Sequence, residues 1–190
     1  MVKDFLGLSK EDYLEYLNVA TKDLKKARAF FSPMTTAPKM IRVLDKLYEK
    51  VRTYNIGIDE NLFDYSIVLG VHSQLNVMPE YLWNKFLVSV GKNDESIAKR
   101  VHLENEFIAS RFNDTIIKAT KQRAFIGLEI SEQGREGSIQ GAAQASLDIQ
   151  KRVDEKEIEV SRRFNVFWPF KLSEKKSYLM LLYMIDVLGR

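Results

Sequence analysis

The segment from Tyr178 to Leu188 constrains the fold most, because it is apolar at almost every position. Asp186 is its single charged residue, and its 11 residues are too few for a bilayer crossing, which needs about 20. We predict a helix that begins at Ser173 and stops at Gly189. A helix that is apolar all round must be covered on most sides, so we expect it at the centre of a bundle or docked on another chain.

The composition indicates a folded protein of a reducing compartment. Hydrophobic residues make up 45% of the 190 residues and charged residues 29%, so a core can be buried and wholesale disorder is not expected. The net charge of +3 is too small to indicate nucleic-acid binding by itself. The lack of cysteine excludes disulfides, cysteine zinc sites and thiol nucleophiles. With no signal-peptide pattern at the start, we predict a cytoplasmic protein, or a virion component assembled in a cytoplasm.

Apolar residues at helical spacing predict a mainly α-helical fold. The first helix begins at Ser9, an N-cap with Asp12 at the capping-box position, and ends before Pro33. It forms an antiparallel pair with the next predicted helix. The remaining predictions for this half are helices at Thr36–Asn55, Pro79–Gly91 and Asp94–Ala119, and either a helix or a strand within 59–77.

The C-terminal half predicts a long helical hairpin or arm. Alternation suggests one small β element near residues 124–132. From Ala142 to Phe167 the apolar spacing fits a heptad, which predicts a long helix. The resulting fold class is a helical bundle, with an N-terminal helical region at 1–92 and the hairpin plus the terminal helix at 93–190.

Gly134, Gly137 and Gly141 form the clearest break in the chain. Backbone amides at a helix start bind phosphate well, but the spacing matches neither the dinucleotide fingerprint nor the Walker loop. A hinge or hairpin between two long elements is therefore the favoured interpretation, and a phosphate loop is the weaker one.

Motifs for catalysis or metal binding are weak. His102 and Glu106 share a helix face, but Glu104 does not, and no second histidine lies nearby. His72 stands alone, and no Gly-x-Ser-x-Gly elbow occurs. Paired carboxylates are abundant, which leaves a two-carboxylate hydrolase open. We expect no metal, no cofactor and no enzymatic activity.

The segment Arg162–Lys171 combines cations with aromatic rings. Such residues anchor protein interfaces or bind single-stranded nucleic acid by stacking and phosphate contacts. The interface prediction, which we favour, comprises Val153, Val160, Phe164, Phe167, Trp168, Tyr178, Leu181, Leu182 and Ile185. The nucleic-acid prediction comprises Arg162, Arg163, Trp168 and Lys171.

These features together predict a non-enzymatic structural or assembly subunit, or an adaptor, in a homo-oligomer or a larger complex away from the membrane. A virion connector or ring is an analogy at the level of architecture. The alternative is a nucleic-acid-binding accessory protein that uses Arg162–Lys171.

Overall fold

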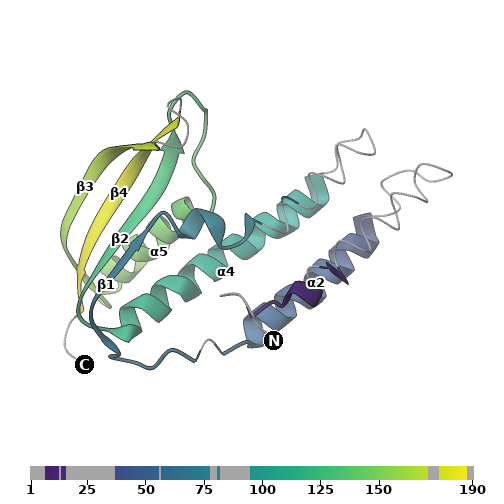
Figure 1. Cartoon of the computed structure of the whole chain (residues 1–190), viewed down its shortest axis with the longest axis horizontal. Helices are drawn as coiled ribbons and strands as arrows, with labels where there is room; N and C mark the ends of the chain where they lie inside the picture. The colour runs from purple at the N-terminus through teal and green to yellow at the C-terminus, as the bar shows by residue number, and fades with distance from the viewer. Residues whose placement is uncertain are drawn as a thin grey trace. The chain divides into compact units, whose positions relative to one another are not determined.

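The computed structural model describes residues 7–12, 14–15, 37–55, 57–77, 81, 95–170 and 176–187. In chain order its elements are α2 (Ala37–Thr53), β1 (Phe63–Leu69), the 3-10 turn η2 (His72–Gln74), α4 (Glu95–Ala119), β2 (Thr120–Glu132), α5 (Ala142–Asp154), β3 (Glu159–Phe170) and β4 (Lys176–Asp186), as Figure 1 shows. The chain divides into two interleaved units: Met1–Ile56 with Asn76–Glu104, and Gly57–Leu75 with Asn105–Arg190. The helix α4 contributes residues to both units.

The first unit contains α2 and the beginning of α4. α2 buries Leu44, Leu47, Tyr48 and Val51, which recur at helical spacing along one face of the helix. Glu104 of α4 is fully buried, and Arg52 donates two hydrogen bonds to its carboxylate, at 2.8 and 3.0 Å. Burial alone would raise the pKa of Glu104, but the hydrogen bonds from Arg52 and Arg100 outweigh it and lower that pKa.

The predicted helix start at Ser9 is confirmed. The Asp12 carboxylate accepts a hydrogen bond from the Ser9 backbone N–H at 2.9 Å, and the Ser9 hydroxyl accepts one from the Asp12 backbone N–H at 3.2 Å. This reciprocal pair is a capping box. Residues 16–36, over which that helix was predicted to continue, lie outside the described part of the chain.

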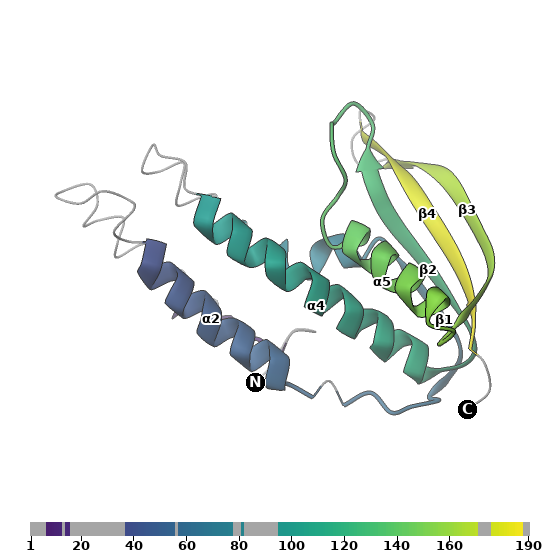
Figure 2. The same cartoon turned by 180° about the vertical axis from the view of Figure 1, so that it is seen from behind.

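The second unit is a four-stranded sheet in the order β1-β2-β4-β3. β1 runs parallel to β2, whereas β4 is antiparallel to both β2 and β3. Figure 2 shows α5 and the C-terminal part of α4 on one face of this sheet. The core lies between them and includes Ala109, Ile117, Ala142, Ala145, Ile149, Ala124, Ile126, Leu128, Leu181, Tyr183 and Ile185.

The prediction of a mainly α-helical bundle is wrong, because two segments predicted to be helical are strands. The helix predicted at Ala142–Phe167 ends at Asp154, and Glu159–Phe170 forms β3. The apolar segment Tyr178–Leu188 was predicted to be the terminal helix, but its residues up to Asp186 belong to strand β4, Lys176–Asp186. A continuous apolar run fits a strand buried on both faces as well as a helix, and here the tertiary context selects the strand.

The way in which α5 ends explains why the predicted helix, Ala142–Phe167, is longer than the observed one. Lys156 has a φ of 61°. The Lys156 N–H donates to the Val153 carbonyl at 3.0 Å, and the Glu157 N–H donates to the Arg152 carbonyl at 2.9 Å. These two bonds form a Schellman motif. Glycine usually occupies the left-handed position of that motif, so a lysine there gave no stop signal in the sequence.

The other predicted elements have mixed outcomes. The helices predicted at Thr36–Asn55 and Asp94–Ala119 correspond to α2 and α4, and the β element predicted near 124–132 lies within β2. The ambiguous segment 59–77 contains β1 and η2. Of the helix predicted at Pro79–Gly91, only residue 81 is described. Among the described residues, no helix combines the length and the apolar character that crossing a bilayer requires.

Candidate functional site

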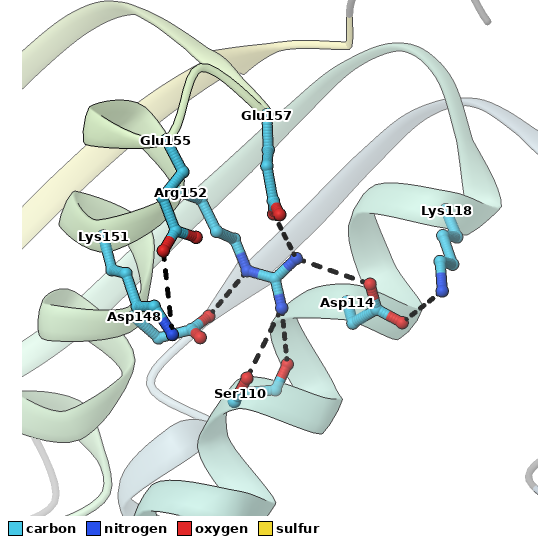
Figure 3. A pocket seen from close by; sticks show the side chains of 8 residues that line it. All are labelled: Ser110, Asp114, Lys118, Asp148, Lys151, Arg152, Glu155 and Glu157. Carbon is cyan, nitrogen blue, oxygen red and sulfur yellow. Dashed lines mark hydrogen bonds and ion pairs between the residues drawn. The ribbon is translucent and has the colours of Figure 1, made fainter.

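A polar pocket of about 600 Å³ opens between α4 and α5 in the second unit. Figure 3 shows the eight side chains that line it: Ser110, Asp114 and Lys118 from α4, Asp148, Lys151 and Arg152 from α5, and Glu155 and Glu157 from the turn that follows α5. The helical spacing of Ser110, Asp114 and Lys118 places them on one side of α4, facing the polar residues of α5.

Arg152 occupies the middle of this pocket and joins its walls. The guanidinium contacts Asp148 at 2.9 Å, and Asp114 and Glu157 at 3.4 Å each (Figure 3). Its Nη2 also donates to the Ser110 carbonyl at 3.3 Å. Burial lowers the pKa of Arg152, but the surrounding acids outweigh that effect and raise it. The guanidinium stays charged and ties α4 to α5.

A buried chain of hydrogen bonds continues inward from Asp148. The Asn113 amide nitrogen donates to the Asp148 carboxylate at 2.9 Å and to the Ala145 carbonyl at 3.1 Å. The Asn113 amide oxygen must therefore accept from His72 Nε2, which lies 2.9 Å away. This fixes the proton of neutral His72 on Nε2. Its Nδ1 is buried and has no hydrogen-bond partner in the described part of the chain.

His72 is thus held in its neutral form. Its ring also packs edge-on against Phe112, with the ring centroids 4.9 Å apart. Burial lowers the pKa of His72 to about 4, although Asn113 and Asp148 act in the opposite direction. A proton on Nδ1 would be a buried donor without an acceptor, which is costly.

The chemistry of this pocket favours a structural role. Its acids and its central cation bind one another, and among the eight lining residues no nucleophile lies beside a free base. His72, His102 and the other described residues form no group of three or more potential metal ligands. The network therefore holds two helices together.

A different surface of the second unit, strand β3, carries four of the nine predicted interface residues: Val160, Phe164, Phe167 and Trp168. β3 lies at the edge of the sheet and pairs with β4 alone among the described strands (Figure 1). The exposed fraction is 51% for Phe164, 70% for Phe167 and 36% for Trp168. A long edge strand with exposed apolar side chains is a template for pairing with another chain, so β3 is our candidate site.

Alternation along β3 divides the aromatic and basic residues between the two faces of the sheet. Arg162, Phe164, Val166 and Trp168 pair with Met184, Leu182, Met180 and Tyr178 of β4. Phe164 and its alternates lie on the face that α5 does not cover, which we call the open face. Arg163 pairs with the core residue Tyr183, and its guanidinium lies 5.6 Å from the centre of that ring.

The open face continues across the sheet to β1. Tyr65, Ile67 and Leu69 alternate with the buried Val68 and are all exposed. At Gly127 of β2 the apolar side chains from both sides converge. A Cβ there would lie 2.6 Å from Leu69 and 2.7 Å from Leu182. The open face is therefore an apolar surface that extends over more than one strand, a feature typical of interaction sites.

Sequence reasoning missed one polar feature of the open face. Glu129 of β2 is buried there and accepts a hydrogen bond from the Ser73 hydroxyl at 2.6 Å. Gly70, with a φ of 66°, allows the approach: a Cβ there would lie 2.8 Å from the Glu129 carboxylate and 3.4 Å from the Trp168 ring. The signal was a single acid among the alternating apolar residues of β2.

The remaining predicted interface residues have different positions. Leu181 and Ile185 are buried in the core, and Val153 and Val160 pack against it. Tyr178 and Leu182 are half-buried on β4. Of the predicted nucleic-acid residues, Lys171 lies outside the described part of the chain, and Arg162, Arg163 and Trp168 lie on β3.

The glycine cluster forms the connection between β2 and α5. Gly134, Gly137 and Gly141 all have positive φ, between 75° and 89°. The Gly141 N–H donates to the Gln144 side chain at 2.7 Å, so that amide is already satisfied. A Cβ on Gly141 would lie 2.4 Å from the His72 carbonyl oxygen. Close packing against η2 explains this glycine without a ligand.

Comparison of the chain with protein-family models, with curated proteins and with solved structures found no match. A function must therefore be inferred from the geometry of the second unit.

Proposed function

We propose that this protein is a non-enzymatic assembly subunit that associates through strand β3. The supporting observation is that β3 is an edge strand of 12 residues with Phe164 and Phe167 exposed on opposite faces. Natural proteins protect long edges with charges, bulges or covering elements. β3 has a register irregularity between Val160 and Arg162, cations at Arg162 and Arg163 and a proline at Pro169, but the stretch between these features, residues 164–168, is regular and apolar except for Asn165.

The polar network of α4 and α5 supports this choice by elimination. It gathers eight polar or charged side chains around one pocket, yet its groups are engaged with one another. The analogy with helical connector and ring proteins does not hold, because the last part of the predicted hairpin is strand β3 and the predicted terminal helix is strand β4. What supports assembly is the exposed edge of a mixed sheet.

The test is the association state in solution, measured by size-exclusion chromatography with light scattering well above micromolar concentration. We expect a discrete oligomer for the unmodified protein and a monomer for the double variant Phe164→Asp, Phe167→Asp. Leu147→Asp is the matched control, because Leu147 on α5 is 71% exposed, about as much as Phe167. A monodisperse monomer of the unmodified chain would contradict the proposal.

The alternative proposal, nucleic-acid binding, is favoured by one observation: Arg162 and Trp168 share the open face. Against it, Arg163 lies beside Tyr183 of the covered face, and Arg123 is bound to Asp186. Fluorescence anisotropy with a labelled single strand at low salt distinguishes the two. Binding that weakens with salt and with Arg162→Ala would support the alternative, and no binding at low salt would remove it.

A further inference from the structure

The free edge of β3 determines what kind of partner fits it. An edge strand presents a row of unpaired backbone N–H and C=O groups, and another extended strand satisfies them best. β3 is 12 residues long, whereas β1, at the opposite edge, has 7. Both edges carry exposed apolar side chains, and β3 is the longer of the two.

The sequence of β3 is complementary to that of a second copy of β3 running antiparallel to it. Its cations Arg162 and Arg163 precede Asn165, and its aromatic residues Phe167 and Trp168 follow it. If two copies of β3 run antiparallel with Asn165 on the two-fold axis, Arg162 lies opposite Trp168 and Arg163 opposite Phe167. Arginine placed on an aromatic ring is attracted by about 0.5–1 kcal/mol at an exposed site.

Charge selects among the possible registers. A register centred on Arg162 or on Arg163 sets that cation directly opposite its own copy, which is destabilising. With Asn165 on the axis, Arg162 is six positions from its own copy, or about 20 Å along the strand. That separation exceeds the screening length of about 8 Å at physiological ionic strength. The same register places the apolar Phe164 opposite Val166.

From these observations we infer that the partner of β3 is a second copy of this chain, paired antiparallel about Asn165. The two four-stranded sheets then form one continuous sheet across the dimer. The contact is isologous, so it closes at two copies. This inference rests on the proposed assembly function and specifies its surface, partner and register.

Disulfide trapping tests the inference cleanly, because the chain contains no cysteine. Residues opposite each other in antiparallel strands have Cα atoms about 4.5–5.5 Å apart, which suits a disulfide. Asn165→Cys should therefore give a covalent dimer under mild oxidation, at least about tenfold faster than a collisional control. That control is Leu147→Cys, since Leu147 is exposed on α5, away from β3.

A second pair of variants tests the register. Phe164→Cys and Val166→Cys should each cross-link poorly alone, because each lies opposite the other position. A mixture of the two, distinguished by the mass of a tag, should give the mixed dimer. Equal cross-linking of Phe164→Cys alone and in the mixture would overturn the register.

The outcomes separate this inference from the proposed function. If Asn165→Cys cross-links no faster than Leu147→Cys, pairing through β3 is wrong. Light scattering on the unmodified chain then decides the rest. An oligomer would show that assembly uses another surface, whereas a monomer would remove the proposed function as well. Growth to long polymers would indicate pairing of β3 with β1 and would also overturn the two-fold contact.

Discussion

Strands β3 and β4 are neighbours that differ in what covers their apolar residues. β4 lies between β2 and β3, and it buries Met180, Leu181, Tyr183 and Ile185. β3 has one neighbour among the described strands and leaves Phe164, Val166, Phe167 and Trp168 exposed. The apolar residues of β4 are accounted for by the core of its own unit. Those of β3 are not, and this difference is the reason to assign β3 to association.

Truncation of a core residue of β4 should reduce stability most. Ile185 is fully buried among core residues of β2, α4 and α5, so Ile185→Ala should lower the free energy of unfolding by about 2–5 kcal/mol. Urea denaturation followed by circular dichroism measures this change. A loss below that of Val166→Ala on β3 would show that the two strands do not differ as described.

The next largest effect is a loss of stability in acid, which His72 causes on the helix-covered side of the sheet. The folded pKa of His72 is about 4 and its ordinary value 6.5, so between these values the unfolded chain binds a proton that the folded chain does not. The stabilising contribution is complete above pH 6.5 and is lost as the pH falls toward 4. Between pH 7 and pH 5 it should decrease by about 2 kcal/mol.

His72→Gln provides the control for this pH dependence. Glutamine keeps a donor for Asn113 but does not titrate, so the difference in unfolding free energy between pH 7 and pH 5 should shrink by that amount. Other groups lowered in pKa, such as Glu104, contribute equally to both proteins. An unchanged pH dependence in the variant would show that His72 is not held neutral.

The elements of the fold that could be predicted from the sequence are those with local signals. The capping pair Ser9 and Asp12 and the amphipathic helices α2 and α4 follow from short-range patterns, and they were predicted. β4 could not be separated from a helix, because leucine and methionine favour helices and its apolar run is continuous. In β3, the spacing of Val160, Phe164 and Phe167 masked the true alternation of Phe164, Val166 and Trp168.

The candidate site was predicted in part. Phe164, Phe167 and Trp168 were chosen for their residue types, and their exposure is visible only once β3 is placed at an edge. Leu181 and Ile185 were included because a helix was assumed, but on β4 they point into the core. The contact between Glu129 and Ser73 joins residues 56 positions apart, a pairing that a single sequence does not specify.

A smaller effect tests the role assigned to the polar pocket. Replacing Arg152 with Gln removes the cation that holds Asp148 and Asp114, and it should lower the free energy of unfolding by about 1–2 kcal/mol. Lys151→Gln is the control, since its contact with Glu155 is exposed and 3.9 Å long. If Arg152→Gln left stability unchanged, the pocket would no longer be explained by structure alone.

Substitution of an exposed residue of β3 should have the smallest effect on stability. Phe167→Ser should change the free energy of unfolding of the monomer by no more than about 0.5 kcal/mol, because the side chain is exposed. Denaturation at a dilution below the association range isolates this quantity. A loss as large as that of Ile185→Ala would mean that Phe167 is a core residue after all.

The position of β4 has a consequence for synthesis of the chain. β4 follows β3 in sequence but inserts between β3 and β2. Until residues 176–186 have left the ribosome, β3 has neither the strand with which it pairs nor a place in the sheet. The nascent protein therefore passes through a stage at which both edges of β3 are exposed.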